Sequence, residues 1–146
     1  MPIETVLLAV GRDDDARMKR MVEAAVDLAA SADARVIVAH AFPTQGSVDD
    51  ALGRLDITGG SPDDVTRRLE SVRVARSELE AAEVNFEIRG LVGDPGSAIS
   101  DLAGEVGADR VIVGGRKRSP TGKAVFGSTA QEILLSAPCP VTFVRE

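Results

Sequence analysis

Residues 5–41 read TVLLAVGRDDDARMKRMVEAAVDLAASADARVIVAHA, and this stretch decides the fold. It opens on a continuous apolar run, Thr5–Val10, which is typical of a strand covered on both faces. A run of aspartates suited to capping a helix follows, and apolar residues then recur along one helical face from Met18 to Ala29. Ala34–Ala41 repeats the strand pattern. A strand, a helix and a second strand in this order predict a crossover that makes the two strands parallel.

The middle of the chain is less regular. Phe42–Gly60 is rich in Gly, Thr, Ser and Asp, so we expect a long variable loop with room for only a short helix. Ser61-Pro62-Asp63-Asp64 then predicts an N-cap followed by proline at the first helical position. The predicted helix carries its apolar face on Val65, Leu69, Val72, Leu79 and Ala82. Val84–Val92 alternates apolar and polar residues, which favours a half-exposed strand at the rim of a sheet.

The same alternation continues to the end of the chain. Asp94-Pro95 opens a helix that Gly107 closes, and residues 110–113 form a short apolar strand. A last helix is expected near Ser128, with Ser128 and Gln131 as a capping box, before a strand over residues 140–144. This order predicts a doubly wound parallel sheet with helices on both faces. Ligands of such sheets bind beyond the carboxyl ends of the strands, which here are the loops after Val10, His40 and Val113.

Size and composition bound the possible functions. The 146 residues fit one domain spanning 1–146, and no apolar run approaches the ~20 residues that cross a bilayer. No basic stretch precedes an apolar segment at the N-terminus, so we expect a cytoplasmic protein. A net charge of −6 disfavours nucleic acid and anionic membranes as partners. The single cysteine, Cys139, excludes an internal disulfide and is interpreted as a small buried hydrophobe.

The segment after Val113 carries the functional signal. Residues 113–129 read VGGRKRSPTGKAVFGST, leave a buried strand and end at a predicted helix start. Glycines let the backbone approach an anion, and the N–H groups at Ser128 and Thr129 would hold it. Four basic side chains and no acidic one occur here in an acidic chain: Arg116, Lys117, Arg118 and Lys123. We interpret the segment as a site for a phosphate or a similar anion.

Simpler interpretations of these residues stay open. Glycine after a strand and serine before a helix are common in turns and caps, and a basic loop can serve only to balance local charge. A Walker loop is excluded, because Gly115 lies too far from Gly122-Lys123 and Ala124 follows the lysine. His40, at a strand end with no second ligand in sight, is more typical of a hydrogen-bonded structural residue than of a catalytic one.

With these segments in view, the sequence resembles the universal stress protein family. Its nucleotide-binding members carry G-x2-G-x9-G-S/T, to which Gly114 and Gly127-Ser128 correspond. The strand ends at Val10 and Ala41 and the tail Ala137–Val141 also look like their family counterparts. The resemblance implies a five-stranded parallel sheet of strand order 3-2-1-4-5, the adenine nucleotide alpha hydrolase-like fold, with four helices.

The resemblance also implies a site and a partner. It places ATP or a phosphate-like anion among the following residues: Val10, Gly11, Ala41, Val113, Gly114, Arg116, Lys117, Gly127, Ser128 and Thr129. It also implies a homodimer that pairs through the last strand, formed by Val141, Thr142, Phe143 and Val144. The sequence departs from the family twice, because Lys117 stands at the second glycine and Gly11 at the acid that ATP-binding members place near the adenine.

Three functions follow as hypotheses. The first is a non-enzymatic stress-response regulator that binds a nucleotide through the loop Gly114–Thr129. The second is a stress-related interaction module that binds no nucleotide. The third is an enzyme of the related superfamily, such as a nucleotidyl transferase, but those sites generally need two histidines in one short motif and this chain has only His40. We favour the first.

Overall fold

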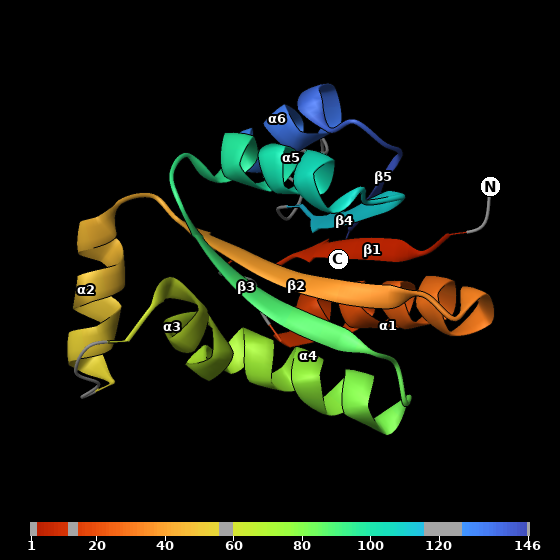
Figure 1. The fold of residues 1–146 in the computed structure, drawn as a ribbon, viewed down its shortest axis with the longest axis horizontal. Helices are drawn as coiled ribbons and strands as arrows, with labels where there is room; N and C mark the ends of the chain where they lie inside the picture. Colours follow the sequence, from red (N-terminus) through yellow and green to blue (C-terminus); the bar gives the residue numbers. More distant parts are fainter. Residues whose placement is uncertain (1–2, 12–14, 56–59, 116–126, 146) are drawn as a thin grey trace, which may run out of the picture.

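The computed structural model describes residues 3–11, 15–55, 60–115 and 127–145, which form five strands and six helices. In chain order these are β1 (Thr5–Ala9), α1 (Asp15–Ala32), β2 (Arg35–Phe42), α2 (Gln45–Arg54), α3 (Pro62–Arg68), α4 (Glu70–Ala81), β3 (Phe86–Val92), α5 (Pro95–Val106), β4 (Arg110–Gly114), α6 (Ser128–Ser136) and β5 (Val141–Val144). All strand pairs are parallel and the order is β3-β2-β1-β4-β5 (Figure 1), which confirms the predicted sheet.

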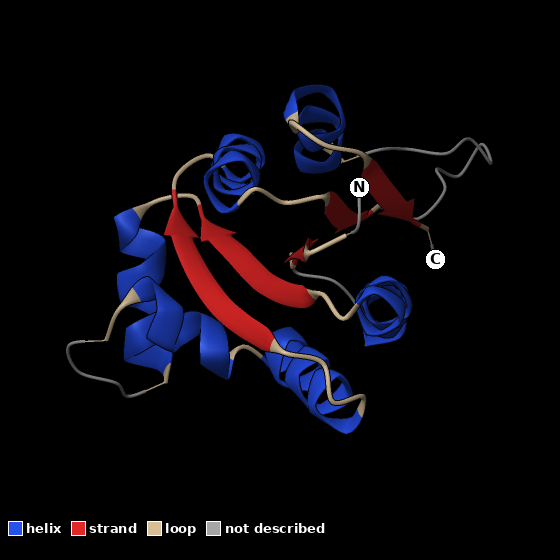
Figure 2. Cartoon of the chain, turned by 45° about the vertical axis from the view of Figure 1, so that its right-hand side comes forward, coloured by secondary structure: helices blue, strands red, loops and turns tan. Residues whose placement is uncertain are grey.

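Helices lie on both faces of the sheet (Figure 2), and an apolar cluster fills the space between each face and its helices. Val6 and Leu8 of the central strand β1 pack with α1 and α4, whereas Leu7 between them packs with α5 and α6. All three side chains are fully buried. A buried leucine or valine contributes about 1.5–3 kcal/mol relative to an exposed one, so the apolar run that predicted β1 also anchors the protein.

The segment from Phe42 to Gly60, expected to be a long loop with room for only a short helix, contains the helix α2 over Gln45–Arg54. Thr44 caps this ten-residue helix by accepting a hydrogen bond from the Ser47 N–H at 3.2 Å. Val48 and Ala51 face inward and pack with Phe42 and Val65 in a small third cluster. The helix lies at the end of the sheet rather than over one of its faces (Figure 1), which is why its apolar stripe is narrow.

The single helix predicted after Ser61 is two helices. Its start is confirmed, since the Ser61 and Asp64 side chains form a reciprocal capping box and Pro62 follows the cap. At Leu69, however, the backbone is extended, with ψ of 140°, and α4 begins anew. No proline or glycine marks this break. It arises from packing, because α3 lies against the edge strand β3 while α4 lies against α1.

The two edges of the sheet differ. At β3, predicted as a rim strand, the outward-facing N–H of Gly90 donates to Asp63 Oδ1 of α3 at 2.5 Å. A side chain on Gly90 would collide with the Pro62 carbonyl, so α3 closes tightly over this edge. At the opposite edge β5 pairs with β4 on one side, and its four residues are half-buried.

Two smaller observations concern the remaining sequence predictions. Cys139 is free and half-buried against the layer formed by α5 and α6, and burial raises the pKa of its thiol. It is thus less buried than the sequence suggested. Among the described helices none is both long and apolar enough to cross a membrane.

Candidate functional site

A cleft of about 1260 Å³ opens at the carboxyl ends of β1, β2 and β4. Eight of the ten predicted site residues line it: Val10, Gly11, Ala41, Val113, Gly114, Gly127, Ser128 and Thr129. The other two, Arg116 and Lys117, lie outside the described residues. Residues from four separate segments of the sequence are therefore brought to one cavity, as the switch in strand order beside β1 requires.

The ends of β1 and β2 form a rigid floor. The Val10 N–H donates to the Ala39 carbonyl at 2.8 Å, and His40 Nδ1 lies 2.7 Å from the Val10 carbonyl oxygen. The His40 ring also meets Phe42 edge-on, with ring centroids 4.6 Å apart. Because Val10 O can only accept, Nδ1 carries the proton. The structural role predicted for His40 agrees with these contacts.

Four described helices, α1, α2, α5 and α6, begin at this end of the sheet. The three whose N-caps are described differ in how their first turns are satisfied. Thr44 caps α2, and Asp94 caps α5 by accepting from the Ser97 N–H at 3.2 Å. At α6 the N-cap is Gly127, which has no side chain to offer. The predicted capping box of Ser128 and Gln131 is wrong, because the helix begins at Ser128 itself. Among the residues that the structure describes, no side chain caps α6, so its first N–H groups are candidates for binding a ligand or water.

The glycines of this region also have packing roles. Gly114 is the last residue of β4, and a Cβ there would lie 2.7 Å from the Met21 sulfur of α1. Gly115 gives up its N–H to the Val144 carbonyl at 3.1 Å, and a Cβ there would strike the Phe143 ring. The absence of side chains at these two glycines therefore lets Met21 and Phe143 pack closely against the chain where β4 ends.

The combination of this sheet order with a cleft at the ends of β1, β2 and β4 agrees with the family model that matches the chain. Residues 2–145 match the universal stress protein family. The chain belongs to this family.

Relatives of known sequence or structure cover nearly the whole chain. A universal stress protein of Thermus aquaticus is 33% identical over 97% of this chain and 98% of its own length. The structure of a universal stress protein from Archaeoglobus fulgidus has a TM-score of 0.76 at 30% identity, covering 97% of this chain and 98% of that one. A universal stress protein from Archaeoglobus fulgidus in complex with dAMP has a TM-score of 0.72 at 25% identity, covering 99% of both chains.

This universal stress protein lines its cleft with further residues that the sequence did not single out. Arg17 approaches from α1 and is half-buried, while Arg54, Arg68 and Arg73 approach from the last turns of α2 and α3 and from α4. Arg17 could have been suspected, because it lies in the first turns of a helix that begins beyond the carboxyl end of β1. The other three depend on the length of α2, which was expected only as a short helix, and on the break at Leu69, which no local pattern marks.

Proposed function

We propose that this universal stress protein is a non-catalytic regulator that binds an adenine nucleotide, such as ATP, in the cleft. Its phosphate groups lie at the start of α6, against the N–H groups of Ser128 and Thr129. The base lies toward Val10, Gly11 and Ala41. The bound dAMP of the relative with the same fold supports a nucleotide as ligand.

The uncapped start of α6 is the observation that carries this proposal. The positive end of a helix and its free N–H groups bind a phosphate without any side chain. Arg17, on the α1 side of the same cleft, adds a positive charge. The caps of α2 and α5 at this end are occupied by Thr44 and Asp94, which favours the start of α6 over these two as the position of the phosphate.

The base is held less specifically than the phosphates. Gly11 stands where the family resemblance places an acid, so no carboxylate is available there to accept from the adenine amino group. We expect the protein to bind ATP and GTP with similar affinity, since one missing hydrogen bond changes affinity by only about threefold to tenfold.

Calorimetric titration with ATP, dAMP, GTP and tripolyphosphate tests the proposal. We expect all three nucleotides to bind more tightly than tripolyphosphate, because the cleft floor contacts the base. The variant Gly11→Asp should then raise ATP affinity by about threefold to tenfold and leave GTP unchanged. Gly11 is exposed, so the substitution has room.

Two results would contradict the proposal in different ways. Equal affinity for ATP and tripolyphosphate would mean that the cleft binds anions but not bases. Failure of every compound to bind at millimolar concentration would favour the second hypothesis, an interaction module without a nucleotide. Hydrolysis of ATP by the purified protein would refute the non-catalytic assignment.

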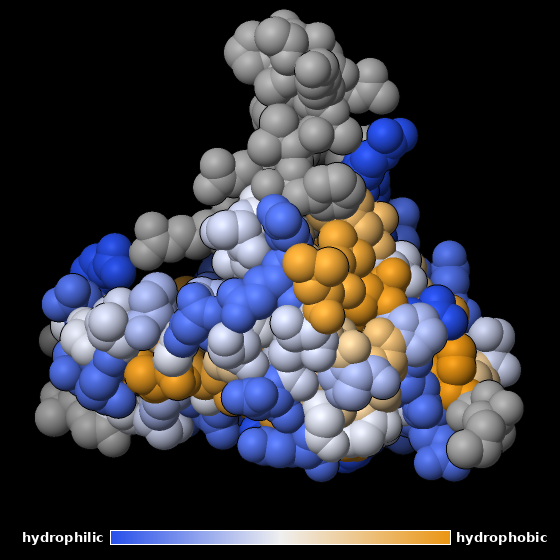
Figure 3. All heavy atoms as spheres, turned by 90° about the horizontal axis from the view of Figure 1, so that it is seen from above, coloured by the Kyte–Doolittle hydropathy of each residue, from blue (hydrophilic) through white to orange (hydrophobic). Residues whose placement is uncertain are grey.

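We also propose that two copies pair through β5, with Val141, Thr142, Phe143 and Val144 at the interface. The exposed apolar side chains of the neighbouring helix support this assignment. Leu135 of α6 is 79% exposed and Leu134 is 38% exposed. Figure 3 shows apolar side chains gathered on the side of the molecule where α5 and α6 lie. Exposed groups of this kind commonly mark a surface that another protein covers.

Sedimentation equilibrium measures this pairing directly. Leu135→Asp places a charge on an exposed position and should weaken the dimer without affecting the fold. Phe143→Asp should give monomers, and circular dichroism must show that this half-buried position tolerates the change. Dimers that persist in both folded variants would rule out this interface.

A further inference from the structure

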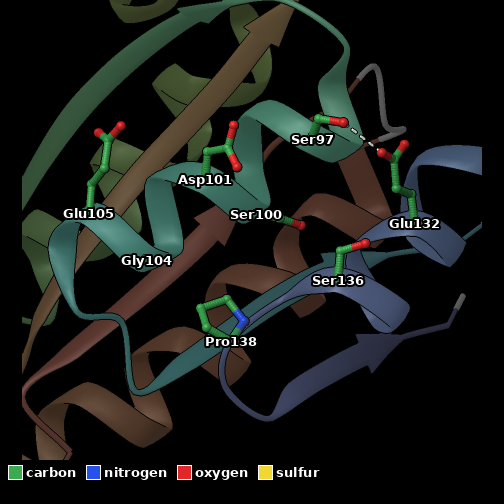
Figure 4. Close-up of a pocket in the computed structure, with 8 residues that line it drawn as sticks. All are labelled: Ser97, Ser100, Asp101, Gly104, Glu105, Glu132, Ser136 and Pro138. Carbon is green, nitrogen blue, oxygen red and sulfur yellow. Dashed lines mark hydrogen bonds between the residues drawn. The ribbon is translucent and has the colours of Figure 1, made fainter.

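A second cavity lies on the opposite side of α5 and α6 from the sheet. This groove measures about 760 Å³ and is lined by Ser97, Ser100, Asp101, Gly104, Glu105, Glu132, Ser136 and Pro138 (Figure 4). It shares no lining residue with the nucleotide cleft. Three of its residues carry carboxylates and none carries a positive charge.

The carboxylates form a line along α5 that is not neutralised. Asp101 and Glu105 are one helical turn apart on the same face, about 6 Å along the axis, where like charges repel. Neither forms an ion pair within the part of the chain that the structure describes. Glu132 stands across the groove on α6 and accepts a hydrogen bond from Ser97 at 2.6 Å. One of its two oxygens is thereby used.

Ser100 supplies an independent observation at the same place. The residue is only 8% exposed, and its Oγ is buried without a hydrogen-bond partner among the described residues. Figure 4 shows this hydroxyl directed from α5 toward α6, between the two rims of the groove. A buried hydroxyl without a partner is unfavourable, whereas a ligand N–H beside it would supply the missing bond.

We propose that the groove between α5 and α6 binds a linear polyamine. Its ammonium groups would pair with Asp101 and Glu105, the negative charge of Glu132 would attract them at the α6 rim, and Ser100 would accept from the nearest of them. Two ammonium groups separated by three or four methylene groups match the one-turn spacing of Asp101 and Glu105. Gly104 and Pro138, which carry no charge, line the groove and would contact the methylene groups of the polyamine.

The cation is organic rather than a single metal ion. Among the described residues no group of three or more His, Cys, Asp or Glu side chains is close enough to hold a metal. The carboxylates are instead spread along the groove, which favours a ligand whose charges are spread in the same way. The assignment is independent of the nucleotide site.

Binding is tested by titrating the whole protein with spermidine while recording backbone amide NMR shifts. We expect saturable shifts confined to residues 96–105 and 132–138, and little effect of NaCl or MgCl₂ at equal ionic strength. Butylamine, with one ammonium group, should bind more weakly than spermidine. The double variant Asp101→Asn, Glu105→Gln should weaken spermidine binding by about fivefold.

Matched controls separate the groove from general charge attraction. Asp27→Asn removes an exposed carboxylate of α1 on the other face of the sheet and should leave spermidine affinity unchanged. Ser100→Ala keeps every carboxylate and should still weaken binding. The proposal fails if Mg²⁺ competes with spermidine at equal concentration, if the variants bind like the wild type, or if only a lysine-rich peptide and not spermidine occupies the groove.

Discussion

The helices α5 and α6 start near each other at one end of the sheet, but their first turns have opposite surroundings. At α5 the Asp94 carboxylate accepts from the Ser97 N–H, and the Glu132 side chain packs against Gly96. At α6 the cap is a glycine and the first turn faces the cleft. The chain thus satisfies the start of α5 with its own acids, whereas no described side chain caps the start of α6, where we propose that the phosphate binds.

The largest effect is expected from a variant that gives α6 an acidic N-cap like that of α5. Gly127→Asp places a carboxylate at a position whose backbone, with φ −66° and ψ 155°, suits a capping residue. The carboxylate would occupy the N–H groups and repel phosphate, so we expect ATP affinity to fall by about tenfold to hundredfold. The unliganded protein should gain a few tenths of a kcal/mol of stability, because glycine is itself a tolerated N-cap residue. Titration calorimetry and urea unfolding measure the two effects.

Gly127→Ala is the matched control for this variant. Alanine has no acceptor, so it should preserve nucleotide binding and leave α6 uncapped. Loss of binding with alanine as well as with aspartate would show that bulk at position 127, rather than charge, blocks the cleft.

The second test removes the cap from α5. Asp94→Ala should lower the free energy of unfolding, because the Ser97 N–H loses its acceptor, while Asp94→Asn keeps an acceptor and should lose less. Neither substitution should change ATP affinity, since α5 does not hold the phosphate. A change in affinity in Asp94→Ala would mean that the two helix starts are coupled.

The pH dependence of stability gives a third, smaller effect. The hydrogen bond from the Ser97 N–H is the main reason why the pKa of Asp94 lies below its ordinary value of 3.8. Hydrogen bonds with the side chains of Glu132 and Ser97 lower this pKa further. Backbone N–H groups of Ser61 and Glu4 similarly lower the pKa of Asp64 and Asp109. The folded protein then binds fewer protons than the unfolded chain, so these contributions are present above the ordinary pKa and are lost as the pH falls through the folded-state pKa.

Urea unfolding between about pH 6 and pH 3 tests this dependence. We expect the urea concentration at the unfolding midpoint to decrease as the pH is lowered below about 4. The decrease should be less steep in Asp94→Asn, because asparagine cannot titrate at this position. If the unfolding midpoint of Asp94→Asn depends on pH as steeply as that of the wild type, Asp94 contributes little to the pH dependence of stability.

The smallest expected effect concerns Ser128. Its side chain does not cap α6, so Ser128→Ala should change the unfolding free energy of the unliganded protein by less than about 0.5 kcal/mol. A loss of about 1 kcal/mol would instead restore Ser128 as the cap that its sequence pattern suggests.

The sequence located the strands and the cleft because both depend on local patterns. An apolar run such as Thr5–Val10 can be satisfied only in a covered strand, and the order of such runs determines which loops meet. The predicted N-cap of α6, Ser128, is one residue away from the observed N-cap, Gly127. Both residues precede the apolar positions of the helix, and only the backbone geometry distinguishes them. The break at Leu69 arises from packing between distant elements, which no local pattern records, and the cleft positions of Arg68 and Arg73 depend on it.

The lid that α3 forms over β3 limits how this protein can assemble. The Asp63 contact and the fit of Pro62 against Gly90 deny that edge to a second sheet, while β5 pairs with a described strand on one side only. If two copies pair through β5, as proposed above, a twofold axis uses both of these edges at once. Growth then stops at a closed pair, whereas two free edges would permit an open fibre. The cover on one side of the sheet thereby sets an upper limit on assembly through the other.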